Sequence, residues 1–119
     1  MKFNFFIGGF YTGHFEIILK KENVSCFISD YPLKPLKPTH TFSIAEDPDW
    51  EILVQYLKTL QWKSYYNAGI FDGKQWELEF KTEEIKVITS GSNAYPRGFK
   101  KLLRLLNNIT AKHGIHKIL

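Results

Sequence analysis

The stretch SGSNAYPRGF at residues 90–99 brings together the residue types best suited to binding chemistry in this chain. Gly91 and Asn93 favour left-handed backbone angles, and the following proline keeps Tyr95 extended. These preferences predict a short loop between a strand and a helix. The stretch is therefore expected to be a turn, and the open question is whether it is also a site.

The helix after this loop begins with positive charge. Arg97, Lys100 and Lys101 lie in its first turns, where the helix dipole disfavours cations. A positive helix start that follows Gly, Ser and Asn resembles a place where backbone N–H groups hold an anion. We predict that Ser92, Asn93 and Arg97 bind a phosphate or carboxylate of a partner. The alternative is a turn beside a basic face that is only solvated.

The helical period extends this prediction to a wider surface. At 100° per residue, the basic side chains of the last helix lie opposite its apolar stripe, and Lys112 continues the basic face. Such a face can contact nucleic-acid phosphates while an aromatic ring stacks on a base. The residues predicted to bind an anion or a partner are Ser92, Asn93, Tyr95, Arg97, Lys100, Lys101 and Arg104.

Other residues that often carry catalysis do not form a recognisable set. Cys26 is the only cysteine, which excludes an intrachain disulfide and a thiolate metal cluster. His113 and His116 are three residues apart, but the glycine between them is expected to end the helix. Glu77 and Glu79 share one face of a strand and are predicted to face solvent. We expect no catalytic residue, no metal and no cofactor.

Length and composition favour a single domain over all 119 residues, numbered 1–119. Hydrophobic residues make up 44% of the chain and charged residues 24%, which is typical of folded proteins. The net charge of +4 permits attraction to nucleic acid without requiring it. No apolar run reaches membrane-spanning length, and residues 1–13 are interpreted as a first strand rather than a secretory signal. The expected location is the cytoplasm.

Alternating apolar residues predict strands between residues 2 and 30. A tight reversal at Glu22-Asn23 would place Leu19 opposite Cys26 and keep the apolar side chains on one side of the sheet. Cys26 is then a core residue, and its thiol is expected to be a poor nucleophile because it lies among apolar neighbours and no helix N-terminus or histidine partner is visible in the sequence to activate it.

Prolines three residues apart mark the segment 31–38, YPLKPLKP, and three residues is the period of polyproline II. The segment is interpreted as a stiff connector, with a ligand for a proline-recognising domain as the alternative. A helix over 48–61 follows, with Asp47 as its N-cap and Pro48 at its first position. Aromatic side chains past this helix are expected to close the core or, alternatively, to line a ligand site; they are Trp62, Tyr65 and Tyr66.

A second hairpin is predicted from alternating residues that follow the turn at 71–73. A reversal at Thr82-Glu83 satisfies two patterns at once, because it pairs apolar residues on one face and opposite charges on the other. The predicted pairs are Phe80 with Ile85, Leu78 with Val87, Glu79 with Lys86, and Lys81 with Glu84.

These elements predict an α+β fold, in which a single antiparallel sheet of about five strands packs against two amphipathic helices. The helices are expected near 48–61 and 96–112. Runs of strands separated by only two helices do not suit a doubly wound parallel sheet. The apolar stripe of the last helix is predicted to contain Phe99, Leu102, Leu103, Leu106, Ile109 and His113.

Two segments in the C-terminal third carry a resemblance. DGKQWELEF at 72–80, followed by SGSNAYPRGFKKLLRLL at 90–106, resembles a recurrent pattern of small, mostly uncharacterised bacterial proteins. The resemblance implies a bacterial, intracellular α+β module and carries no activity, cofactor or catalytic residue. Arg97, Lys100 and Lys101 lie where acidic or neutral residues are expected in similar proteins, so the basic face is particular to this chain.

The absence of a catalytic set, together with abundant aromatics and extended prolines, leads us to expect a non-enzymatic protein-interaction module. The second class is a nucleic-acid or anion-binding protein that uses the basic face of the last helix. An enzyme is the third class, because a fold can bring together catalytic residues that are distant in sequence.

Overall fold

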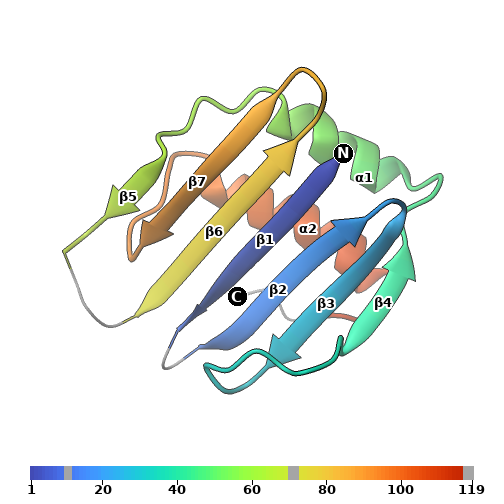
Figure 1. The fold of residues 1–119 in the computed structure, drawn as a ribbon, viewed down its shortest axis with the longest axis horizontal. Helices are drawn as coiled ribbons and strands as arrows, with labels where there is room; N and C mark the ends of the chain where they lie inside the picture. The colour runs from blue at the N-terminus through green and yellow to red at the C-terminus, as the bar shows by residue number, and fades with distance from the viewer. Residues whose placement is uncertain (10–11, 70–72, 117–119) are drawn as a thin grey trace.

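A mixed β-sheet with two helices on one face forms the protein (Figure 1). The computed structural model describes residues 1–9, 12–69 and 73–116. The strands lie in the order β4-β3-β2-β1-β6-β7-β5. The elements are β1 (Lys2–Gly9), β2 (Gly13–Lys20), β3 (Asn23–Ser29), β4 (His40–Ser43), α1 (Pro48–Leu57), β5 (Tyr65–Asn67), β6 (Lys74–Lys81), β7 (Lys86–Ser92) and α2 (Phe99–Ala111).

The predicted α+β class is confirmed, but the single antiparallel sheet of about five strands is wrong. The described residues form seven strands, and β5 runs parallel to β7. The two strands that the sequence pattern missed are the edge strands β4 and β5. They contain four and three residues, too few to show a period of two. Their shortness also limits the unpaired edge that the sheet exposes.

The core lies between the sheet and the two helices. Apolar residues of period two supply the sheet side, as predicted, and Phe3, Phe5 and Ile7 of β1 are all buried there. Phe3 contacts Trp50 of α1 edge-to-face, with ring centroids 5.4 Å apart. Phe5 contacts the first residue of α2, Phe99. The central strand therefore anchors both helices, while no helix of the described residues lies on the other face of the sheet (Figure 1).

Both helices are shorter than predicted. Asp47 caps α1 as expected, because its carboxylate accepts the backbone N–H of Asp49 at 2.9 Å. The helix ends at Leu57 rather than near 61. The helix α2 begins at Phe99 rather than near 96, because Gly98 has a φ of 92°, outside the helical region. Its buried residues include Leu105 and Thr110, and His113 is exposed instead of completing the stripe.

The predicted register of the β2–β3 hairpin is wrong by two residues. Leu19 lies opposite Val24, and Cys26 lies opposite Ile17. The turn consists of Lys21 and Glu22, and Lys21 adopts a φ of 57°. A shift of two residues returns the same side chains to the same face, so the apolar pattern is satisfied equally well by both registers.

The β6–β7 hairpin differs from its prediction in the same way. Phe80 lies opposite Val87, and the charge pairs predicted for Glu79 with Lys86 and Lys81 with Glu84 are absent among the described residues. The loop is longer than two residues because the Thr82 hydroxyl accepts the N–H groups of Glu84 and Ile85. Glu79 instead forms ion pairs with Lys2 and Lys81.

Cys26 is fully buried, as predicted for a core residue. Burial raises the pKa of its thiol to about 11. The thiol is therefore protonated at neutral pH and unsuited to nucleophilic chemistry.

The proline segment 31–38 is attached to the helix-free face of the sheet. The Lys34 ammonium lies 3.2 Å from the Glu16 carboxylate and 4.4 Å from the centroid of the Phe27 ring. The chain bends at 31–33 and again at 36–37, so the segment is not one straight polyproline II helix. The connector and the proline-recognition motif both remain predictions. No helix among the described residues is long and apolar enough to cross a membrane.

Candidate functional site

The turn between β7 and α2 is held by aromatic side chains from three other segments. Three elements, α1, the loop after it and β6, each supply one donor to a backbone carbonyl of this turn. Such bonds fix the turn in one conformation, because each satisfies a carbonyl that would otherwise need water. The donors and acceptors are Tyr56 Oη to the Gly98 oxygen (2.8 Å), Trp62 Nε1 to the Arg97 oxygen (3.1 Å) and Trp76 Nε1 to the Ala94 oxygen (2.9 Å).

Gly91 and Asn93 shape the turn in different ways. Asn93 adopts a φ of 54°, as predicted, whereas Gly91 has no positive φ and lies within β7. Gly91 is needed for space, because a Cβ there would lie 2.3 Å from Trp76 Nε1. The Asn93 Oδ1 atom accepts a hydrogen bond from the backbone N–H of Lys74 at 2.9 Å, and the backbone N–H of Asn93 donates to the backbone oxygen of Lys74. These bonds join the turn to the start of β6.

The aromatic residues after α1 belong mainly to the core. Trp62 and Tyr66 are half-buried, and both contact the buried Trp76 ring. Their ring centroids lie 6.0 Å and 6.1 Å, respectively, from that of Trp76. Tyr65 is exposed and takes no part in this cluster. Trp76 also contacts Phe99 at 4.8 Å. The aromatic cluster therefore packs against the first residue of α2, Phe99.

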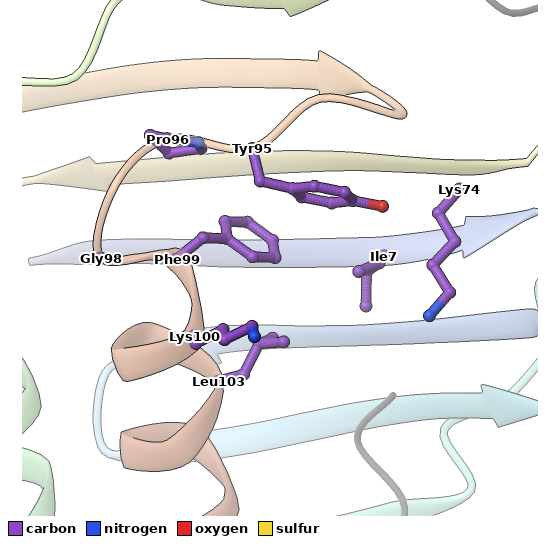
Figure 2. A pocket seen from close by; sticks show the side chains of 8 residues that line it. All are labelled: Ile7, Lys74, Tyr95, Pro96, Gly98, Phe99, Lys100 and Leu103. Carbon is purple, nitrogen blue, oxygen red and sulfur yellow. The ribbon is translucent and has the colours of Figure 1, made fainter. Parts of the chain in front are cut away.

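A cavity of about 400 Å³ lies beside this turn (Figure 2). Its walls come from β1, the start of β6, the turn and the first part of α2. The apolar part of the lining includes Ile7, Phe99 and Leu103, and the polar part includes Lys74 and Lys100. Cavities of this size and composition are typical of small-molecule sites.

Tyr95 forms another wall of the cavity. Its ring packs against Phe99 at 4.9 Å, and 43% of its surface is exposed. Burial raises the pKa of the Tyr95 hydroxyl, so this group is protonated at neutral pH and can donate a hydrogen bond. In Figure 2 the hydroxyl points toward Lys74.

Four cations in the first turns of α2 and in the loop before it have no acidic partner among the described residues. Within the described ranges, Arg97, Lys100, Lys101 and Arg104 form no ion pair, although all four are exposed. The first turn of α2 contains no acidic residue, and its N-cap position offers no side-chain acceptor. The Lys101 ammonium lies 4.8 Å from the centroid of the Tyr56 ring.

Lys112 differs from the other basic residues of this helix. Its ammonium forms ion pairs with Asp47 and with Asp49, the latter at 2.9 Å. Burial alone raises the pKa of Asp47, but hydrogen bonds from Lys112 and from the Asp49 N–H outweigh this and hold the pKa below its usual value. Lys112 therefore connects the end of α2 to the start of α1 and is not free for a ligand.

The structure brings together only part of the predicted site. Tyr95 and Lys100 line the cavity, whereas Arg97, Lys101 and Arg104 lie outside its lining. Ser92 ends β7 and pairs with Gln75 and Asn67, and Asn93 bonds to Lys74. The predicted anion contact by Ser92, Asn93 and Arg97 stays a prediction.

Six of the described residues that line the cavity were not among the predicted site residues; they are Ile7, Lys74, Pro96, Gly98, Phe99 and Leu103. Ile7, Lys74 and Leu103 come from segments far apart in the chain, and no local pattern connects them. The alternation of β1 did predict that Ile7 faces the core. Asp72, the first residue of the segment that carries the bacterial resemblance, lies outside the described residues. No group of His, Cys, Asp and Glu suited to hold a metal ion occurs in the part of the chain that the structure describes.

Comparisons with known proteins find no family model that matches the chain and no similar curated protein or solved structure.

Proposed function

We propose that the protein is a non-enzymatic interaction module that binds an acidic segment of a partner protein through the exposed face of α2. This surface, defined by Lys100, Lys101 and Arg104 of α2 and by Arg97 of the loop before it, is called the α2 basic face below. The observation that carries the proposal is that these four cations have no acidic partner among the described residues.

The position of these cations makes their presence costly. Lys100 and Lys101 are the second and third residues of α2, where the helix dipole favours carboxylates. Neither lysine forms an ion pair within the described chain, and both are exposed. Cations that oppose the helix dipole and have no acidic neighbour lower the stability of the folded protein. We therefore infer that these lysines serve to contact a partner and not to stabilise the fold.

A protein partner is favoured over nucleic acid by the surroundings of the basic face. Tyr95, the aromatic residue available to stack on a base, packs instead against Phe99. Arginines beside an anchored tyrosine and an apolar cavity are typical of the centre of a protein interface. Nucleic acid remains the alternative function, since its phosphates would also pair with these cations.

The test is affinity capture from host lysate with the tagged protein and two charge-reversed variants, each with and without nuclease treatment. Lys101→Glu with Arg104→Glu changes the α2 basic face without touching the cavity lining. Lys20→Glu with Lys86→Glu makes the same charge change on exposed strand residues and serves as the matched control.

The proposal predicts a stoichiometric protein that binds the wild type and the control variant and is lost with the α2 variant. Capture of nucleic acid that disappears after nuclease treatment would favour the alternative. Equal capture by all three proteins would exclude the α2 basic face as the binding surface.

A further inference from the structure

The cavity beside α2 is walled by apolar groups in fixed positions. Ile7 and Phe99 are buried, and Phe99 packs against the fully buried Trp76. Leu103 is half-buried one turn further along α2. The volume of the cavity, about 400 Å³, exceeds the space that one water or one methyl group needs. An apolar body the size of an aromatic ring with a short chain therefore fits, and its burial is favourable.

The charged groups that line the cavity, among the described residues, are both cations. Lys74 begins β6 and Lys100 belongs to the first turn of α2, and no acidic residue of the described ranges contributes to the lining. In the described ranges neither ammonium forms an ion pair. The backbone of Lys74 is held in place on both its N–H and its carbonyl by Asn93.

The Tyr95 hydroxyl adds a neutral donor near Lys74. In Figure 2 the Tyr95 hydroxyl and the Lys74 side chain both lie beside Ile7, and the Lys74 ammonium extends away from the hydroxyl along Ile7. Because this hydroxyl is protonated at neutral pH, it can donate to an anion that the ammonium attracts. The polar lining formed by described residues thus offers donors and no carboxylate.

We propose that the cavity binds a small monocarboxylate whose apolar body is about the size of a phenyl ring with a short chain. The apolar body packs against Ile7, Phe99 and Leu103, and the carboxylate lies where Lys74 and Tyr95 donate to it. Lys100 contributes a second positive charge at the cavity. A phosphate dianion fits less well, because the lining offers few donors and mostly apolar surface.

This site shares Lys100 with the α2 basic face, but the other residues of the two sites differ. Lys74 and Leu103 line the cavity and lie outside the α2 basic face, whereas Lys101 and Arg104 belong to that face and not to the cavity. Either binding activity can therefore be lost while the other is kept.

The test is a titration of isotope-labelled protein with 3-phenylpropanoate and, separately, with its neutral counterpart 3-phenylpropanamide, followed by amide NMR spectra. The carboxylate should cause saturable shifts at Ile7, Lys74, Tyr95 and Leu103, with a Kd of about 0.1–1 mM as expected for a ligand of this size. The amide should bind about tenfold more weakly, because it lacks the charge-assisted hydrogen bond.

Variants separate the two parts of the site. Lys74→Gln should weaken carboxylate binding about tenfold and leave amide binding unchanged. Leu103→Trp should fill the cavity and abolish binding of both compounds, while Lys101→Gln, outside the cavity, should leave both unchanged. Absence of saturable shifts at these residues, equal affinity for the two compounds, or unaltered carboxylate binding by Lys74→Gln would each overturn the proposal.

Discussion

Replacing Lys100 by glutamate is expected to stabilise the protein. Lys100 is the second residue of α2, is exposed and forms no ion pair with any described residue. A charge at a helix terminus changes the free energy of unfolding by about 0.3–1 kcal/mol, so reversing its sign changes it by about 0.6–2 kcal/mol. The new carboxylate would also lie four residues before Arg104, which favours the helix by about 0.3–0.5 kcal/mol.

The expected net gain for Lys100→Glu is about 1 kcal/mol, because solvent screening reduces the effect of an exposed charge. For a chain of this size that corresponds to an increase in Tm of about 3–6 °C. Thermal unfolding followed by circular dichroism in low salt measures it. The gain should shrink in about 1 M NaCl, where the Debye length is about 3 Å.

Two further variants make the measurement specific. Arg104→Glu makes the same charge change in the second turn, where the dipole is weaker, and should change stability by less than about 0.5 kcal/mol. Lys101→Glu should gain stability from the helix dipole but lose the contact of Lys101 with the Tyr56 ring, which contributes about 0.5–1 kcal/mol. The net change in the free energy of unfolding should therefore be small. If Lys100→Glu lowers Tm in low salt, the argument that these cations are retained at a cost to the fold is refuted.

Three other predictions follow from the core and from α1. Gly91→Ala should lower stability by about 1–3 kcal/mol, because its Cβ would lie 2.3 Å from Trp76 Nε1, whereas Ser90→Ala should cost less than about 0.5 kcal/mol; denaturant unfolding compares them. Cys26, with a pKa of about 11, should react with a thiol reagent at pH 8 only after unfolding, and rapid reaction of the folded protein would contradict its burial. Asp47→Asn keeps a capping side chain but removes the charge that Lys112 pairs with. The pKa of Asp47 is lower in the folded protein than in the unfolded chain, where it is near 4, so the ionised carboxylate stabilises the folded protein above that pH. The stability advantage of wild type over Asp47→Asn should therefore vanish as the pH falls through the folded pKa. Tm measured for both proteins between about pH 7 and pH 2 tests this.

The sequence predicted elements whose signals are local. Asp47 followed by Pro48 identified the start of α1, and the alternation in β1 identified the face that enters the core. The same alternation could not determine the hairpin registers, because a shift of two residues preserves the buried face. Loop chemistry at Lys21 and at Thr82 decided them instead.

The candidate site was predictable only in part for a related reason. Asn93 and the basic start of α2 are local signals and were recognised. The cavity depends on Ile7, Lys74 and Leu103 meeting in space, which requires the order of β1 and β6 in the sheet. The aromatic donors that hold the turn likewise come from distant segments, so an abundance of aromatics indicated a core but not its bonds to residues 94–98.

The most direct test of the proposed function is the affinity of a captured protein partner for wild type and for Lys101→Glu with Arg104→Glu, measured at low and at moderate salt. Binding through the α2 basic face predicts that the variant loses most of the affinity at low salt while its Tm stays within a few degrees of wild type. Equal affinity of the two proteins, with both folded, would contradict the central claim that these cations contact an acidic partner.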